Sequence, residues 1–129
     1  MVICRIRTNF INYTPIYKHR EGDSVGGGLA ILIRSDLGLT LQPFIPSSLE
    51  VHGVKIILQN NHPITIINLY NPNKAISLPE CEHYLNQVEP SSLIIGDFNA
   101  HSPQWEPGHA YNVSGRNLHD FLVHTLILH

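Results

Sequence analysis

Leu93-Ile94-Ile95-Gly96-Asp97-Phe98-Asn99 is the stretch that decides the fold class of this chain. Its apolar start predicts a short buried strand that stops at Gly96-Asp97. An apolar strand that delivers a carboxylate to its carboxyl end is typical of α/β proteins, which place ligands there. Side chains two apart in an extended segment point the same way, so Asp97 and Asn99 are expected to face one site while Phe98 turns inward. The stretch therefore predicts an α/β protein with a polar site at this strand end.

Four segments upstream also predict strands, because they are apolar runs or alternate with a two-residue period. The first follows three glycines and suits a strand buried on both faces. The last two are expected to form a hairpin, with Thr65, Ile67 and Leu69 on one face of the final strand and Asn68 and Tyr70 on the other. Residues 1–25 carry no clear period. The four predicted strands cover residues 29–33, 37–42, 54–59 and 64–70.

Two segments have the spacing of amphipathic helices. Ser77 and Glu80 have capping-box spacing, which predicts a helix over residues 78–88. A second helix follows an irregular loop after Asn99, with Ser114 as its expected cap. This order of strands and helices predicts a mixed sheet with helices on one face. The apolar positions that mark the helices are Leu78, Cys81, Leu85 and Val88 in the first, and Leu118, Phe121, Leu122 and Leu126 in the second.

Length and charge limit the classes of function open to this chain. Its 129 residues suffice for one domain, and 43% hydrophobic with 14% charged residues are typical of a globular protein. A net charge of -2 at pH 7 argues against a protein that holds nucleic acid by bulk electrostatics alone. Four early cations are expected to be a solvated stretch, with a basic arm as the alternative. They are Arg5, Arg7, Lys18 and Arg20.

The cysteines, the histidines and the hydropathy bear on the cellular compartment, on a membrane partner and on a zinc site. Cys4 and Cys81 form no disulfide framework, so an intracellular, reducing compartment is expected. No apolar run approaches the ~20 residues needed to span a bilayer, so no membrane partner is expected. Nine histidines are present, but none has Cys partners at zinc spacing and a His-x-x-Glu-His helix is missing, so no structural zinc site is expected.

Asp97 and Asn99 carry the chemistry that the sequence suggests. A carboxylate can deprotonate water or hold a divalent cation, and an amide can donate to a phosphate oxygen without adding charge, so the pair suits phosphodiester hydrolysis. The alternative is an ordinary polar turn, since Asp and Asn both favour turns. A separate predicted strand also has polar residues at its end, namely Asn68, Tyr70 and Asn73. This similarity favours a site shared by the two strand ends.

Four stretches have the order and spacing of a known family from about residue 13 to 124. They are Gly26 to Arg34, Ile67 to Pro72, Gly96 to His101 with Trp105, and Asn112 through Arg116 to Leu118. In these stretches the chain resembles the endonuclease/exonuclease/phosphatase superfamily, and specifically the endonuclease domain of jockey-type non-LTR retrotransposons. Residues 1–129 are therefore expected to be a single truncated domain of this type, in which residues 1–12 match poorly.

The resemblance implies roles for individual residues. Asp97 is similar to the family's catalytic aspartate, which orients or deprotonates the attacking water, and Asn99 to its asparagine beside phosphate and metal. Tyr70 resembles an active-site tyrosine near the scissile phosphate. Mg²⁺ held by Asp97 and Asn99, and DNA as the partner, are implied in the same way. For His101 the alternative is a loop hydrogen bond, and Trp105 is expected to be a packing anchor. The substrate-binding residues implied are Asn73, His101 and Asn68.

The chain departs from that family in two respects. Active members carry a metal-holding glutamate on an early strand and end with a Ser-Asp-His segment; Glu21 and Glu50 sit in other contexts, and the chain stops before that segment. The α/β sandwich is therefore expected to be partial, with its second sheet largely missing, and activity is expected to be orders of magnitude down. An exposed sheet face makes self-association an expectation.

Three hypotheses follow for function. The first is a fragment of a retrotransposon-encoded, metal-dependent DNA endonuclease that nicks a target site, nuclear in location and inactive as it stands. The second is a non-catalytic remnant or binding module. The third is another phosphoesterase of the same superfamily, acting on lipid or nucleotide phosphates. The block from Gly96 to His101 with Trp105 favours the retrotransposon branch over the third hypothesis.

Overall fold

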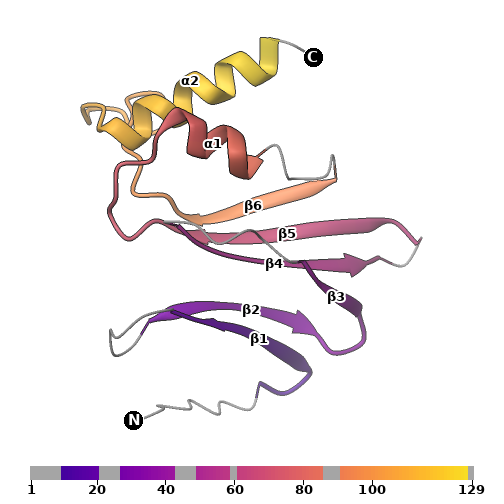
Figure 1. Cartoon of the computed structure of the whole chain (residues 1–129). Helices are drawn as coiled ribbons and strands as arrows, with labels where there is room; N and C mark the ends of the chain where they lie inside the picture. Colours follow the sequence, from indigo (N-terminus) through magenta and orange to yellow (C-terminus); the bar gives the residue numbers. More distant parts are fainter. Residues whose placement is uncertain (1–9, 21–26, 43–48, 59–60, 86–90, 128–129) are drawn as a thin grey trace.

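The computed structural model of this chain describes residues 10–20, 27–42, 49–58, 61–85 and 91–127. Those residues form six strands and two helices (Figure 1). The strands are β1 (Tyr13–His19), β2 (Gly28–Arg34), β3 (Gly38–Gln42), β4 (Glu50–Ile57), β5 (Pro63–Tyr70) and β6 (Ser92–Asp97). The helices are α1 (Leu78–Leu85) and α2 (Val113–Ile127).

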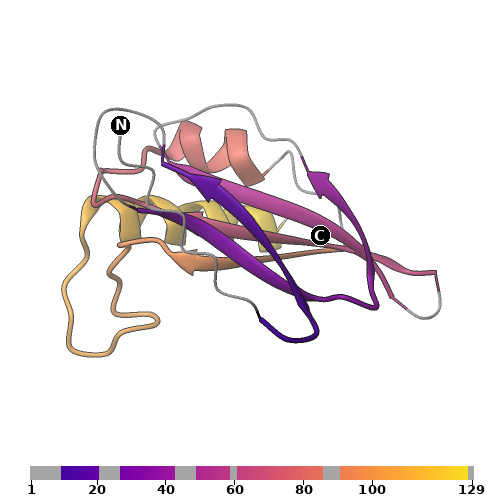
Figure 2. The ribbon, with the colours of Figure 1, turned by 90° about the horizontal axis from the view of Figure 1, so that it is seen from below.

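The strands form two sheets. β1 and β2 pair antiparallel, whereas the larger sheet has the order β3-β4-β5-β6. Its neighbours are antiparallel except that β6 runs parallel to β5, because α1 carries the chain back across the sheet. Both helices lie on one side of the larger sheet and the two-stranded sheet lies on the other (Figures 1 and 2). This confirms a partial α/β fold with a mixed sheet and helices on one face.

Two apolar clusters join these three layers, and the alternation of β5 explains both. Ile67 and Leu69 face the helices, where they belong to a cluster with Tyr84 and Phe121. The residues that alternate with these two along β5 face the two-stranded sheet, where Ile66 packs against a second cluster. The two predicted faces of this strand are therefore confirmed. Burying one such aliphatic side chain stabilises the fold by about 1.5–3 kcal/mol. The second cluster contains Ile31, Ile33, Val54 and Ile56.

Two strands are less buried than the sequence predicted. In β2, Ile33 is buried but Leu32 is 43% exposed, so the prediction of burial on both faces is wrong. In β6, Ile94 packs toward the helices while Leu93 and Ile95 are 49% and 45% exposed. The physical reason is the same in both strands, since each has a packed layer on one side only. β1, within the segment that showed no clear period, was not predicted.

The start of α1 follows the predicted capping box. The backbone N–H of Ser77 donates to Glu80 Oε2 at 2.8 Å, and the N–H of Glu80 donates to Ser77 Oγ at 3.4 Å. Leu85, Val88 and Leu126, which were expected to mark the apolar helix faces, lie outside the described side chains. Neither described helix has the length and apolar character needed to cross a membrane.

The start of α2 differs from the prediction, because the cap is Asn112 and not Ser114. Asn112 Oδ1 accepts a hydrogen bond from the N–H of Gly115 at 2.7 Å, the bond that defines a helix N-cap. Ser114 is buried instead, where its hydroxyl donates to the carbonyl of Lys74 at 3.1 Å and accepts from the N–H of Ile76 at 3.0 Å. It joins α2 to the segment between β5 and α1.

Candidate active site at the carboxyl ends of β5 and β6

Tyr70 and Asp97 end two neighbouring parallel strands. β5 pairs with β6 so that Tyr70 lies opposite Asp97. Directly paired residues project from the same face of a sheet, here the face toward the two-stranded sheet. Both residues line an open cavity of about 260 Å³, together with Asn68, whose Nδ2 donates to the carbonyl of Ala30 at 3.2 Å. The structure thus brings three of the predicted site residues to one place.

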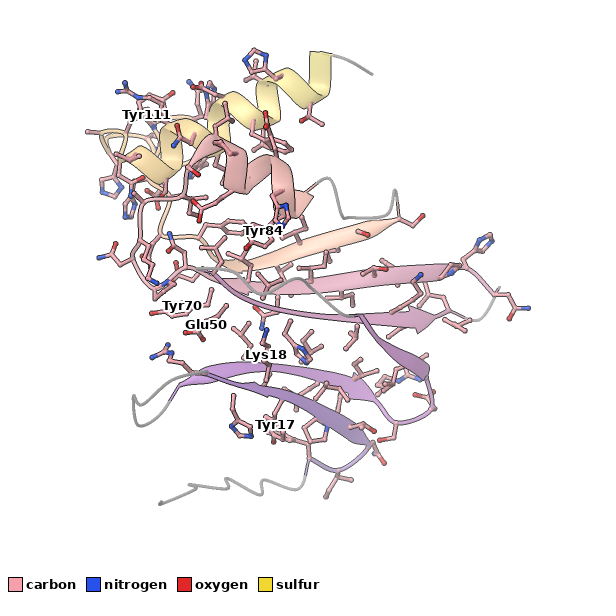
Figure 3. All side chains as sticks on the ribbon, in the orientation of Figure 1. Tyr17, Lys18, Glu50, Tyr70, Tyr84 and Tyr111 are labelled. Carbon is pink, nitrogen blue, oxygen red and sulfur yellow. The ribbon has the colours of Figure 1, made fainter. Side chains whose placement is uncertain are left out.

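Arg20 places a cation in the same cavity, although the sequence predicted a solvated stretch for it. Its guanidinium carbon lies 5.6 Å from the centroid of the Tyr70 ring. Its Nε donates to Glu50 Oε1 at 2.5 Å, and this hydrogen bond raises the pKa of Arg20. Glu50 pairs with Tyr70 in the register of β4 and β5, and the two are labelled side by side in Figure 3. A guanidinium beside a tyrosine hydroxyl suits a phosphate group.

Asp97 and Asn99 are held together by a turn and not by an extended strand. β6 ends at Asp97, and Asn99 has a left-handed backbone with φ of 45°, so the predicted extended geometry is wrong. The predicted outcome is nevertheless seen, because Asp97 and Asn99 line one cavity and Phe98 packs against the helix-side cluster. The N–H of Asn99 donates to Asp97 Oδ1 at 3.0 Å, which is an Asx turn. Asn99 Nδ2 donates to the carbonyl of Asn71 at 2.7 Å. A polar turn was the alternative interpretation of this pair. The structure shows that such a turn is what positions these two side chains.

Asn71 is a positioning residue that the sequence analysis missed. Its side chain is fully buried at 0% exposure, with Nδ2 donating to the carbonyls of Lys74 and Phe98, each at 2.8 Å. Its own N–H donates to the carbonyl of Asp97 at 2.8 Å. Asn71 thereby ties the end of β5 to the end of β6. Its place before a proline at a strand end is typical of ordinary turn residues, so the family-like stretch Ile67 to Pro72 contained it without indicating this role.

Gly96 lets β6 approach β5 closely. Its φ is +142°, and a Cβ atom at this position would lie 1.8 Å from the carbonyl oxygen of Leu69. Only glycine fits such a contact without displacing the backbone. Because Asp97 follows directly, this glycine sets how near the carboxylate lies to the end of β5.

Asp97 also borders a second open cavity, of about 500 Å³, which it shares with Asn99 and His101. Trp105 lines this cavity, and its Nε1 donates to the carbonyl of Ala100 at 2.8 Å, a bond that anchors the loop. The loop is the long segment between β6 and α2 in Figure 2. The apolar lining of this second cavity includes Ile94, Phe98, Leu118 and Leu122.

Two further predicted residues differ in their relation to the cavities, since His101 lines the larger one and Asn73 lines neither. His101 Nδ1 lies 2.7 Å from Glu106 Oε2, so this ring makes the loop hydrogen bond that was its alternative role. Asn73 is exposed, has φ of 60°, and lines neither cavity. Its N–H donates to the carbonyl of Asn71 at 2.7 Å. Asn73 therefore lies beside the site but outside the two cavities.

The oxygen atoms of Asp97 and Asn99 fit a hard divalent cation. Asp97 is exposed and uses Oδ1 to accept from the N–H of Asn99, which leaves Oδ2 available. The side-chain nitrogen Nδ2 of Asn99 donates to the carbonyl of Asn71, which leaves the side-chain oxygen Oδ1 of Asn99 available. Mg²⁺ prefers such oxygen ligands and keeps several waters. These two residues would hold the ion that the family resemblance implies.

Comparison with known proteins places this geometry in a family. The family model described as endonuclease-reverse transcriptase matches residues 64–128, about half of the 129-residue chain. That span contains β5, α1, β6 and α2, and with them Tyr70, Asp97 and Asn99. No match was found among curated proteins or among solved structures. The chain belongs to the endonuclease-reverse transcriptase family.

Proposed function

We propose that this chain carries the phosphodiester-cutting site of a metal-dependent DNA endonuclease encoded by a jockey-type retrotransposon. The observation that supports it is the shared cavity of Arg20, Tyr70 and Asp97 at the ends of two parallel strands. A cation, a hydroxyl and a carboxylate are the groups that hold a phosphodiester and activate water beside it. The family match covers the two residues that β5 and β6 supply.

Each side chain has a distinct part in the proposed reaction. Asp97 accepts a proton from the attacking water or orients it. Arg20 and Tyr70 donate to the non-bridging oxygens of the phosphate, so they stabilise the charge that grows there. Asn99, whose amide nitrogen donates to the carbonyl of Asn71, offers its side-chain oxygen Oδ1 beside Asp97. Mg²⁺, when bound by Asp97 and Asn99, supplies Lewis-acid polarisation of the phosphate.

The proposed activity of this polypeptide alone is low. Among the described residues that line the cavity with Tyr70, Asp97 is the one carboxylate. Glu50 lies nearby but is engaged by Arg20. One carboxylate and one amide hold Mg²⁺ less firmly than the larger oxygen sets common in metal sites. This observation favours DNA binding without efficient cutting as the second candidate function.

Nicking of supercoiled plasmid in Mg²⁺ tests the proposal. The unchanged chain is expected to nick slowly, and Asp97→Asn, which keeps the size of the side chain, is expected to abolish that signal. Asp120→Asn is the matched control, because Asp120 is an exposed carboxylate on α2. Equal nicking by the chain and by Asp97→Asn would contradict catalysis at this site. Binding of the same plasmid by both proteins, with no cutting, would then support the second candidate.

DNA is the proposed partner. A nuclear location is proposed for a functional protein, and self-association is proposed as well. Leu93 and Ile95 of β6 are exposed on the face that looks away from the helices. β6 is also an edge strand of the larger sheet. An apolar face next to an open edge favours pairing with a second copy. Leu93→Lys is expected to remove association in analytical ultracentrifugation; a monomer before the substitution would contradict the idea.

A further inference from the structure

His101, Glu106 and His109 converge at the tip of the loop between β6 and α2. Glu106 Oε2 lies 2.7 Å from His101 Nδ1 and 3.3 Å from His109 Nδ1. One potential ligand atom from each residue lies within 4.8 Å of the others. The two imidazole rings stand edge to face with centroids 6.0 Å apart. From this arrangement we propose that the three side chains form a binding site for a borderline divalent ion such as Zn²⁺.

The chemistry of the ligands selects the ion. Two imidazole nitrogens and one carboxylate oxygen form the set that zinc enzymes use when a fourth position stays open. Imidazole suits Zn²⁺, whereas Mg²⁺ prefers oxygen alone. The site is therefore chemically distinct from the pair of oxygens on Asp97 and Asn99. Three protein ligands leave one position for water or for an oxygen of another molecule.

The distances require a small expansion to admit the ion. Ligand atoms at about 2.0–2.1 Å from a tetrahedral Zn²⁺ lie about 3.3 Å from one another. His109 and Glu106 are already at 3.3 Å, and the ring of His101 would have to move outward from its 2.7 Å contact. All three side chains are partly exposed, so this movement meets little packing resistance.

The backbone holds the three ligands in place before any ion arrives. Glu106-Pro107-Gly108-His109 forms a turn in which the N–H of His109 donates to the carbonyl of Glu106 at 3.1 Å. Proline second and Gly108 third, with φ of 92°, are the residues that a type II turn demands. The N–H of Glu106 donates to the carbonyl of Ser102 at 2.8 Å, which brings this turn back toward His101. The ligand set is therefore preorganised.

This ligand set escaped the sequence analysis, which looked for cysteine pairs and for a histidine helix. Its third ligand is a glutamate, and the motif His-x-x-x-x-Glu-Pro-Gly-His lies wholly in a loop. The Glu-Pro-Gly-His turn was the available signal, because it places its first and fourth side chains side by side. The inference does not depend on the proposed nuclease activity.

Metal titration of the whole chain tests the site. Zn²⁺ is titrated by calorimetry, and Co²⁺ is added to a second sample because tetrahedral cobalt absorbs strongly in the visible range. One tight site per chain is expected. His109→Gln and Glu106→Gln are expected to weaken it about tenfold or more, at least the loss that removal of a supporting partner causes. His62→Gln, in the turn between β4 and β5, is the matched control and is expected to bind as the unchanged chain does.

Two outcomes would overturn the site. Either the unchanged chain binds Zn²⁺ no more tightly than His109→Gln, or His62→Gln weakens binding as much as the loop variants do. Hydrogen exchange gives an independent readout: Zn²⁺ is expected to slow exchange of the amides between Ala100 and Asn112 in the unchanged chain and in His62→Gln, but not in the two loop variants. Circular dichroism of the variants checks that the fold persists, as their exposed positions predict. Plasmid nicking plays no part in this test. A failure of the metal-site proposal can therefore be distinguished from a failure of the proposed nuclease function.

Discussion

Asn112 and His101 are joined by two reciprocal hydrogen bonds across 11 residues of chain. The N–H of Asn112 donates to the carbonyl of His101 at 3.1 Å, and the N–H of His101 donates to Asn112 Oδ1 at 3.0 Å. Asn112 Nδ2 also donates to the carbonyl of Asn99 at 2.8 Å, while Oδ1 caps α2. One asparagine therefore fixes the helix start and the loop that carries the proposed site residues.

Asn112→Ala is expected to lower the free energy of unfolding by about 2 kcal/mol. Loss of a helix cap costs about 0.5–2 kcal/mol, and two further hydrogen bonds to the loop are removed with it. Asn112→Asp keeps the acceptor for α2 and for His101, so it is expected to recover at least half of the loss. Urea unfolding measures the series. An unchanged midpoint for the alanine variant would show that the loop is held by other contacts.

Gly115→Ala separates helix propensity from packing. Alanine at a helical position is favoured over glycine by about 1 kcal/mol, so propensity alone predicts a more stable protein. A Cβ atom on Gly115 would lie 1.8 Å from the carbonyl oxygen of His101, a contact that forces the backbone apart. We expect a net loss of about 2 kcal/mol or more. Gly38→Ala is the control, because nothing lies within 4 Å of its added Cβ, and thermal unfolding should barely change.

The sequence predicted those parts of the fold whose pattern is local. The capping box at Ser77 and the two faces of β5 follow from spacing alone, and both were confirmed. β1 has no such pattern, since its half-exposed residues gain their order from pairing with β2. The site likewise contains one residue that a local pattern predicted and one that it did not. The carboxylate Asp97 was recognisable at a strand end, whereas Arg20 reaches the cavity only through the strand that was missed.

His52 is expected to make stability depend on pH. Burial and, second, the charge of Lys18 lower the pKa of His52 below its ordinary value of 6.5, and its Nε2 is buried without a hydrogen-bond partner. A depressed folded pKa gives stability that is present above pH 6.5 and lost as the pH falls toward the folded pKa. Urea unfolding between pH 7 and 5 should show this loss. His52→Gln should flatten it, and His62→Gln should not; equal slopes in all three proteins would refute the assignment.

Cys81 is expected to resist alkylation in the folded protein. Burial is the main cause that raises the pKa of this thiol from 9.0 to about 11, and the residue is 4% exposed. Two pH units mean roughly 100-fold less thiolate, the reactive form, at pH 8. Iodoacetamide labelling of a Cys4→Ser chain should therefore be at least that much slower than labelling in urea. The raised pKa also predicts that stability present below pH 9 is lost as the pH rises toward 11.

Arg20 provides the sharpest test of the cavity as a phosphate site. Its Nε pairs with Glu50, while its guanidinium carbon lies over the Tyr70 ring in the cavity that Asp97 also lines. Loss of one charged donor to a phosphate is expected to weaken binding to single-stranded DNA about tenfold in Arg20→Gln. Arg34→Gln is the matched control, because Arg34 also pairs with a carboxylate, Asp36, but lines neither cavity.

Salt dependence makes the outcome specific to a phosphate contact. If Arg20 neutralises one phosphate, the slope of log affinity against log salt should fall by about 0.7 in Arg20→Gln, the value for one contact to a single strand. Fluorescence anisotropy at several salt concentrations gives that slope. A weaker affinity with an unchanged slope would mean that Arg20 acts by holding Glu50 at the start of β4, and that the cavity has no phosphate-binding cation. Equal effects of Arg20→Gln and Arg34→Gln would mean that the cavity does not bind DNA, because only general charge would then be at work.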